Sequence, residues 1–174
     1  LTLMDRMADE GFRFIDTRHE QAAVDMANAY GRITIKPGVT MFTTPGHANA
    51  IPGLTMAHHM ESPVINIVGY AAQDRFGQGA AQEIDQVGMA RQATKGAWLI
   101  PASHRIPDMF ATAFRTALEG RRGPVHLTIP AEIQEGAVAE SRIEFHRPDE
   151  HRSSALRPTD PATASAIVGM LHDA

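Results

Sequence analysis

The stretch Pro63-Val64-Ile65-Asn66-Ile67-Val68-Gly69 decides the fold. It is a nearly continuous apolar run of strand length, which is typical of a parallel strand whose two faces are both covered. Four more short runs are predicted as strands, at residues 12–15, 39–43, 98–101 and 124–130. Segments with apolar residues at helical spacing lie between them. Strands that alternate with helices through short turns predict an α/β fold, with a doubly wound, mainly parallel sheet and helices on both faces.

A carboxylate, Glu20, stands where the first predicted strand gives way to a helix. Residues 12–15 alternate and are aromatic or β-branched, and the helix is predicted over residues 18–32. In open α/β sheets, ligands bind outside the carboxyl ends of the strands, where helix N-termini offer free N–H groups, so Glu20 is a candidate binding residue. Thr17-x-x-Glu20 also fits a capping box, in which Glu20 would only bond the first N–H groups of its own helix. The pattern alone favours this second interpretation.

Two irregular segments are further candidates for ligand binding. Residues 44–50, Thr-Pro-Gly-His-Ala-Asn-Ala, are predicted to form a glycine-bearing loop that opens the third helix. Residues 70–92 have no clear period and are rich in Gln, Gly and Ala. We therefore predict a long functional loop with a short helical turn in this region.

Composition excludes several classes of protein. With 174 residues, the chain has the length of one ordinary domain and can bury a substantial core. The net charge is −4 and both signs are interspersed, so neither a nucleic acid nor a membrane is expected as a partner. The sequence has no cysteine, which excludes a disulfide scaffold, a thiolate zinc site and a cysteine nucleophile. It shows no signal peptide and no apolar run of membrane-spanning length, so a cytoplasmic location is expected.

Several common catalytic motifs are missing from the sequence. The stretch His19-Glu20-Gln21-Ala22-Ala23 begins like the zinc-protease motif H-E-x-x-H but lacks the second histidine, so it cannot place two ligands on one helix face. Neither a Walker loop, nor G-x-G-x-x-G, nor a G-x-S-x-G elbow is present. His58 and His59 are adjacent and point in different directions on a helix, so we expect no metal site there.

The chain is predicted to be organised in three parts. These are a domain at residues 1–139, a charged linker at residues 140–157 and, at residues 158–174, the first helix of a following domain. Asp160-Pro161 has the pattern of an N-cap followed by proline at the first helical position. The chain opens on Leu1 rather than Met and stops inside this helix, so we expect a fragment.

An ordered set of short segments resembles the pyrimidine-binding domain of thiamine-diphosphate-dependent enzymes. The later segments recur in the branch that contains acetolactate synthase, benzaldehyde lyase and 2-hydroxyacyl-CoA lyase, and the resemblance covers about residues 1–133. The segments that carry it are Arg18-His19-Glu20-Gln21-Ala22-Ala23, Met26-Ala27, Tyr30-Gly31-Arg32, Lys36-Pro37-Gly38-Val39, Pro45-Gly46 with Asn49, Ser62-Pro63-Val64-Ile65, Gln82-Glu83-Ile84-Asp85-Gln86, Thr94-Lys95, Gly123-Pro124-Val125 and Ile129-Pro130.

The resemblance implies a catalytic role for Glu20 and reverses the preference for a cap. In this family the glutamate of the R-H-E motif hydrogen-bonds the aminopyrimidine ring of thiamine diphosphate, which favours the imino tautomer that removes the proton from the thiazolium carbon. By position, Glu20 is the implied cofactor activator and Gln82 is a catalytic polar group that faces the substrate. The residues implied to line the pyrimidine pocket are Thr44, Pro45, Gly46 and Asn49.

Two residues depart from the pattern of this family. Thr44 stands where members usually have glycine, so the approach of the backbone to the cofactor is expected to differ. His47 stands where a small residue is usual. It is either a substrate-side acid or base or, the interpretation favoured by its place in a predicted loop, an exposed histidine.

The resemblance further implies that parts of the site lie outside this sequence. The Gly-Asp-Gly…Asn segment that holds Mg²⁺ and the diphosphate belongs to a separate domain, and the family's first strand should precede Leu1. No metal ligand is therefore expected in this chain. The other half of the cofactor site normally comes from a second subunit, so a homo-oligomer is expected. Some acetolactate synthases carry FAD in the middle domain, which leaves a flavin open.

The predicted function is thiamine diphosphate binding within a carboligase, lyase or decarboxylase of acetolactate-synthase type. Its substrates would be 2-oxo acids or 2-hydroxy carbonyl compounds. The chain alone is expected to be inactive and to bind the cofactor poorly. The alternative is a non-catalytic, doubly wound ligand-binding or regulatory domain, in which Glu20 only caps its helix and the Gly46 loop binds another small anion.

Overall fold

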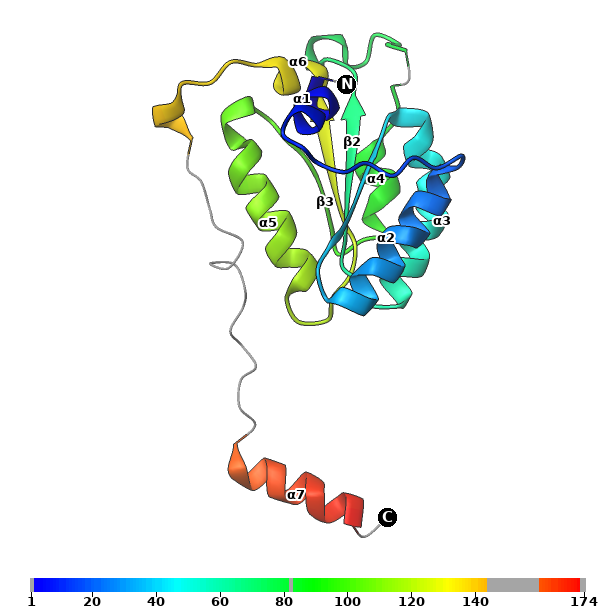
Figure 1. Cartoon of the computed structure of the whole chain (residues 1–174), viewed down its shortest axis with the longest axis vertical. Helices are drawn as coiled ribbons and strands as arrows, with labels where there is room; N and C mark the ends of the chain where they lie inside the picture. The colour runs from blue at the N-terminus through cyan, green and yellow to red at the C-terminus, as the bar shows by residue number, and fades with distance from the viewer. Residues whose placement is uncertain (1, 82, 144–159, 173–174) are drawn as a thin grey trace.

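A parallel sheet forms the centre of the structure. The computed structural model describes residues 2–81, 83–143 and 160–172. The strands lie in the order β1 (Gly38–Phe42), β2 (Val64–Tyr70), β4 (Val125–Pro130) and β3 (Gly96–Leu99). Each adjacent pair is parallel, so the C-terminal ends of the strands meet at one edge of the sheet. Helices cover both faces (Figure 1), and the predicted doubly wound α/β fold is confirmed.

The α-helices are α1 (Thr2–Asp9), α2 (Glu20–Thr34), α3 (Thr44–His59), α4 (Gln86–Arg91), α5 (Ile106–Leu118), α6 (Ala131–Glu135) and α7 (Pro161–His172). Short 3₁₀ helices, η1 (Gln73–Arg75), η2 (Ser103–Arg105) and η3 (Glu140–Arg142), lie in the connections. Helices α2, α3 and α4 lie on one side of the sheet, and α5 lies on the other, where α1 and α6 also pack (Figure 1).

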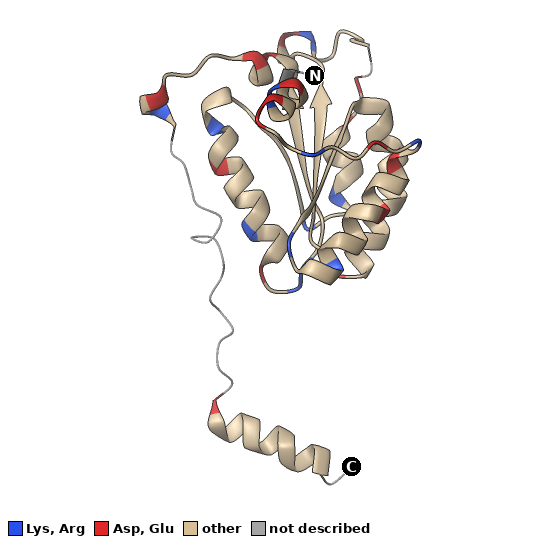
Figure 2. Cartoon of the chain, in the orientation of Figure 1, with Lys and Arg blue, Asp and Glu red and all other residues tan. Residues whose placement is uncertain are grey.

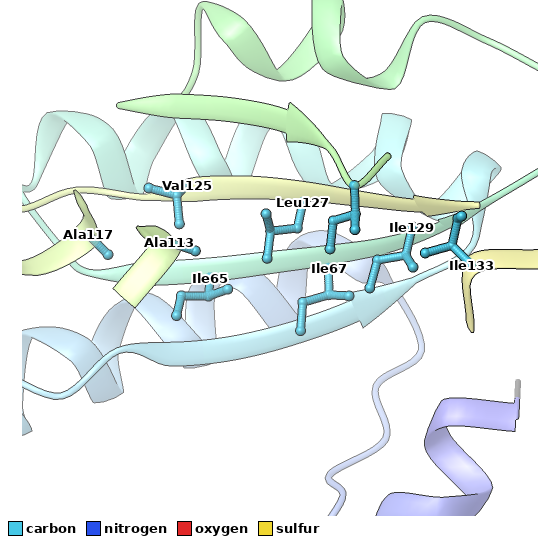
Figure 3. Packing of buried hydrophobic residues seen from close by; sticks show 9 residues of the cluster. Ile65, Ile67, Ala113, Ala117, Val125, Leu127, Ile129 and Ile133 are labelled. Atoms are coloured by element: carbon cyan, nitrogen blue, oxygen red, sulfur yellow. The ribbon is translucent and has the colours of Figure 1, made fainter. Parts of the chain in front are cut away.

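The sheet face toward α5 carries an apolar core (Figure 3). Successive side chains of a strand point to opposite faces, so the odd-numbered residues of β2 and β4 share this one. They pack against the small residues Ala113 and Ala117 of α5 and against Ile133 of α6. The strand residues of this cluster are Ile65, Ile67, Val125, Leu127 and Ile129. Burying each large aliphatic side chain contributes about 1.5–3 kcal/mol, so this layer is a main source of stability.

The opposite face combines an apolar cluster with buried polar residues. Val24 and Ala27 of α2 pack with the apolar stripe of α3. Gly38 of β1 lies so close to Ala27 that an added Cβ would overlap the alanine, which lets α2 rest directly on the strand. Asn66 of β2 and His126 of β4 also point to this face and are fully buried. The sheet is therefore apolar on one face and partly polar on the other.

Residues 12–15 do not form the predicted strand. Their backbone is irregular, and β1 ends the described sheet, so no neighbouring strand pairs with them there. A strand requires ladder hydrogen bonds to a neighbour, and alternation of side chains cannot replace them. Phe12 and Ile15 consequently stay about 60 % exposed, at 59 % and 60 %.

The prediction of a loop at residues 44–50 is also wrong, because these residues form the beginning of α3. Pro45 lies in the first turn, where a residue needs no intrahelical N–H bond, so it does not prevent the helix from starting there. The irregular region predicted at residues 70–92 contains α4 as its short helical part. Residues 71–81 and 83–85 hold only η1.

The helix that was predicted to begin at Asp160-Pro161 is present as α7. Asp160 accepts hydrogen bonds from the N–H groups of Ala162 and Thr163, both at 3.0 Å, and Pro161 is the first residue of α7. The apolar residues of α7 are exposed in the structure, for example Leu171 at 74 %. Residues 144–159, which include most of the predicted linker, lie outside the described residues, so the division into domains stays a prediction.

Charges are spread over the molecule. Figure 2 shows acidic and basic positions interspersed on the helices and connections. The ion pairs Arg105–Asp108 (2.8 Å) and Arg121–Glu61 (3.0 Å) join partly or largely exposed side chains, so each contributes little to stability. Within the described ranges, no helix combines the length and apolar character that crossing a bilayer requires.

Candidate functional site

Glu20 is the first residue of α2, but it does not complete the predicted capping box. The N-cap is His19, whose Nδ1 accepts a hydrogen bond from the Gln21 N–H at 3.2 Å. Thr17, the expected cap, donates its hydroxyl proton to the His19 carbonyl at 3.0 Å instead. Thr17 therefore does not cap the helix, and Thr17 and Glu20 do not form a capping box.

The Glu20 carboxylate reaches across to α3. Its Oε2 accepts a hydrogen bond from Asn49 Nδ2 at 3.1 Å. Hydrogen bonding from its own backbone N–H, and next from Asn49, lowers the pKa of Glu20 below its ordinary value. The carboxylate is thus ionised at neutral pH and lies at the N-termini of α2 and α3, where negative charge is favoured. The Glu20 side chain therefore contacts its own backbone in α2 and the Asn49 side chain in α3.

Gly46 permits this approach between the two helices. A Cβ at this position would lie 2.8 Å from Glu20 Oε1 and 2.9 Å from Glu20 Cγ, which is closer than real Cβ contacts. Only glycine leaves room for the carboxylate in its observed position. We call Glu20, Gly46 and Asn49 the glutamate site.

Two of the other predicted pocket residues occupy different environments. Pro45 is exposed in the first turn of α3. Thr44 is buried, and its Oγ1 accepts a hydrogen bond from Gln86 Nε2 at 2.7 Å. The side chain of Thr44 therefore points into the protein, and only its backbone is near the glutamate site.

His47 is not the exposed loop histidine that we expected. It is 0 % exposed, and its ring stacks on that of His126 with the centroids 4.4 Å apart. Burial lowers the pKa of His47, so the ring is neutral at pH 7. The prediction fails because residue 47 lies on the buried side of a helix and not in a loop. No described contact joins His47 directly to Glu20.

A cavity of about 540 Å³ is lined by none of the residues of the glutamate site. It opens between the C-terminal ends of β2, β3 and β4 and the connection before α4, and its lining includes Tyr70, Leu99 and Gln86. Glu83 also lines it, and its carboxylate accepts hydrogen bonds from the N–H groups of Gly77 (2.6 Å) and Ala80 (3.2 Å). Gln82, the predicted substrate-facing residue, lies outside the described residues, so its role stays a prediction.

The glutamate site has groups that suit a flat, nitrogen-containing ring. A partly buried carboxylate next to a glycine can accept a hydrogen bond from a flat, nitrogen-containing ring that approaches it. Across residues 2–81, 83–143 and 160–172, no three acidic or histidine side chains are grouped so that they could hold a metal ion. His58 and His59 accordingly belong to no such group.

Comparison with known proteins places the chain in a family. Residues 1–89 match the family described as "Thiamine pyrophosphate enzyme, N-terminal TPP binding domain". Thiamine pyrophosphate is the same compound as thiamine diphosphate. The chain belongs to this family, as the resemblance of its motifs predicted.

Acetolactate synthases are among the relatives that the chain matches. It is 37 % identical over 139 residues to the probable acetolactate synthase large subunit of Methanocaldococcus jannaschii, which covers 79 % of this chain and 24 % of that protein. It is 34 % identical to the large subunit of Buchnera aphidicola over 163 residues, 93 % of this chain and 28 % of the relative. It is 34 % identical over 154 residues to the large subunit of acetolactate synthase isozyme 3 of Escherichia coli, which covers 88 % of this chain and 26 % of the relative. The chain spans about a quarter of the length of these relatives and is acetolactate-synthase-like, so the alternative of a non-catalytic ligand-binding or regulatory domain is not favoured.

The sequence predicted Glu20, Gly46 and Asn49 as site residues, and the structure brings these three together, but the prediction missed the buried polar residues behind them. Asn66 and His126 interrupt runs that we interpreted only as apolar strands. A polar residue in the middle of a fully covered strand needs a partner. That rule was the signal that could have indicated a buried polar cluster.

Proposed function

We propose that this chain supplies the cofactor-activating side of the thiamine diphosphate site in an acetolactate-synthase-like enzyme. The observation that carries the proposal is the Glu20 carboxylate, which lies over Gly46 with its Oε2 bonded to Asn49. When bound, thiamine diphosphate would supply the carbon nucleophile and act as the electron sink.

Each residue of the glutamate site has a separate role in this proposal. Asn49 Nδ2 holds Oε2, so that Oε1 stays available to the cofactor ring. Glu20 would donate a proton to the ring nitrogen and take it back. Gly46 keeps the space that this exchange requires. Covering the site would remove water and raise the pKa of Glu20 toward the range in which a carboxylate exchanges protons efficiently.

The substrates that we propose are 2-oxo acids or 2-hydroxy carbonyl compounds, and the product class depends on the whole protein. Mg²⁺ would bind the diphosphate through residues outside the described ranges, and a second copy of the protein would cover the glutamate site. Whether FAD is also bound can be tested by its absorption at visible wavelengths. We further propose a cytoplasmic location, a domain at residues 1–139, a linker at residues 140–157 and the start of a further domain at residues 158–174.

Pyruvate consumption by the complete protein, with thiamine diphosphate and Mg²⁺ added, tests the proposal. Glu20→Gln keeps the shape of the side chain but removes its proton chemistry, so kcat should fall by about 10²- to 10⁴-fold with an unchanged melting temperature. Asp16→Asn removes an exposed carboxylate from the same segment and should keep wild-type kcat.

The proposal would be wrong if Glu20→Gln lost stability but retained its kcat, because Glu20 would then serve only its helix. If the wild type binds thiamine diphosphate but does not consume pyruvate, benzoin and 2-hydroxyacyl compounds are the next substrates to test.

A further inference from the structure

A cluster of buried polar side chains lies behind the glutamate site, on the sheet face that α3 and α4 cover. Each member is at most 5 % exposed. The members face one another across β1, β2 and β4, since Thr40 pairs in register with Asn66 and Asn66 with His126. We call them the buried polar network: Thr40, Thr44, His47, Asn66, Gln86, His126 and Thr128.

Two backbone carbonyls fix the direction of the hydrogen bonds in this network. The Gln86 carbonyl can only accept, so His47 Nε2, at 3.1 Å, carries a hydrogen. The Gly69 carbonyl likewise requires the amide nitrogen of Gln86, at 3.1 Å, which leaves Gln86 Oε1 to accept from the Thr128 hydroxyl at 2.9 Å. Thr128 has then used its proton and accepts from His126 Nε2 at 2.7 Å.

Asn66 completes the network between the two rings. The amide nitrogen of Asn66 can only donate, so both Nδ1 atoms accept from Asn66 Nδ2, at 3.2 Å from His47 and 3.0 Å from His126. Asn66 Oδ1 accepts from Thr40 Oγ1 at 2.9 Å. Both histidines are therefore neutral, and both protons of the Asn66 amide have a partner. A network with its partners satisfied holds its members in one geometry.

The network also fixes the beginning of α3. The N-cap residue Thr43 makes no side-chain hydrogen bond to the helix. The first turn is instead bonded to the rest of the protein through Thr44 and His47. Gly46 lies between Thr44 and His47 in the sequence, and Asn49 lies two residues after His47. Gly46 therefore lies in a turn that the network holds in place, and Asn49 lies in the turn that follows it.

We propose that His47 is a positioning residue: its hydrogen bonds to Asn66 and Gln86 hold the first turn of α3 where Gly46 and Asn49 meet the carboxylate of Glu20. This inference rests on the proposed function of Glu20 and adds a residue that acts through Gly46 and Asn49. His47 is fully buried and would act through these residues without touching the cofactor or the substrate.

The test compares His47→Phe with His126→Phe in the complete protein. Both rings are fully buried and each makes two side-chain hydrogen bonds, but those of His126 end on β2 and β4 and not on α4. Both variants should lower the melting temperature by similar amounts. His47→Phe should reduce kcat with thiamine diphosphate by roughly 10- to 100-fold more than His126→Phe, as a displacement of about 1 Å in an active site does.

A second readout needs no cofactor. Hydrogen exchange followed by mass spectrometry should show faster exchange of the peptide covering residues 43–50 in His47→Phe, and a clearly smaller change in His126→Phe. Added to Glu20→Gln, the His47→Phe change should lower the remaining kcat by less than about twofold, because the group it positions is already disabled.

Equal losses of kcat in the two phenylalanine variants, or unchanged exchange at residues 43–50, would overturn the inference. If His47→Phe does not fold, His47→Gln keeps a donor for the Gln86 carbonyl and should give the same pattern in weaker form; full kcat and wild-type exchange in that variant would also overturn it. Failure of the wild type to bind thiamine diphosphate would refute the proposed function alone, because exchange still reports whether His47 holds the turn.

Discussion

Replacing Gly46 by alanine should separate stability from catalysis. Alanine is a better helix former than glycine by roughly 0.5–1 kcal/mol, and residue 46 is helical, so the backbone gains from the change. The new Cβ would lie 2.8 Å from Oε1 and 3.1 Å from Cδ of Glu20. The end of this partly exposed side chain can turn away, which relieves the contact but breaks the bond to Asn49. We therefore expect an unchanged or higher melting temperature and a kcat lower by about 100-fold.

Gly53 provides the matched control in the same helix. A Cβ there would lie 2.8 Å from Cβ of Val24, which is fully buried and cannot move aside. Gly53→Ala should therefore lose about 1–3 kcal/mol of stability through overpacking while its folded fraction keeps normal kcat. Thermal unfolding and steady-state kinetics of the two variants check the contrast. Full activity of Gly46→Ala, or a loss of stability as large as that of Gly53→Ala, would refute the argument.

Two further predictions concern stability. Burial lowers the pKa of His47 and His126, so below about pH 6.5 the unfolded chain binds more protons than the folded one. The free energy of unfolding should then fall with falling pH, by up to about 1.4 kcal/mol per unit for each ring, and urea unfolding from pH 5 to 8 should show a smaller slope for His126→Gln. Lys95 donates hydrogen bonds to carbonyls at the C-terminal end of α5, including that of the C-cap residue Glu119 at 2.6 Å. Lys95→Met should therefore lower the free energy of unfolding in urea by about 1 kcal/mol, whereas Lys36→Met, at an exposed position, should change it by almost nothing.

The two central strands, β2 and β4, were predictable because burial on both faces requires a nearly continuous apolar run in the sequence. The strand predicted at residues 12–15 failed for the converse reason, since a strand depends on a neighbour that local alternation does not report. The start of α3 failed because Thr-Pro-Gly is common in turns, although proline is equally at home in the first turn of a helix.

The burial of His47 could have been predicted from spacing. It precedes Ala50, Leu54 and Ala57 by three, seven and ten residues, which places it on the same buried stripe of α3. The partners of His47 could not be found in this way, because Asn66 and Gln86 come near it only through the strand register and the placement of α4. The contact of Glu20 with Asn49, 29 residues apart, likewise depends on how α2 and α3 pack.

The fixed direction of the hydrogen bonds has a consequence for how this sequence can evolve. Gln86→Glu would remove the N–H donor of the hydrogen bonds to Thr44 Oγ1 and to the Gly69 carbonyl. Asn66→Asp would remove the N–H donor of the hydrogen bonds to the two histidine rings. Neither change can be tolerated without a compensating change in a neighbour. Apolar residues on the α5 face can instead be exchanged one at a time if volume is preserved. Among homologous sequences, the polar positions should therefore covary as a set, and the aliphatic positions should drift independently.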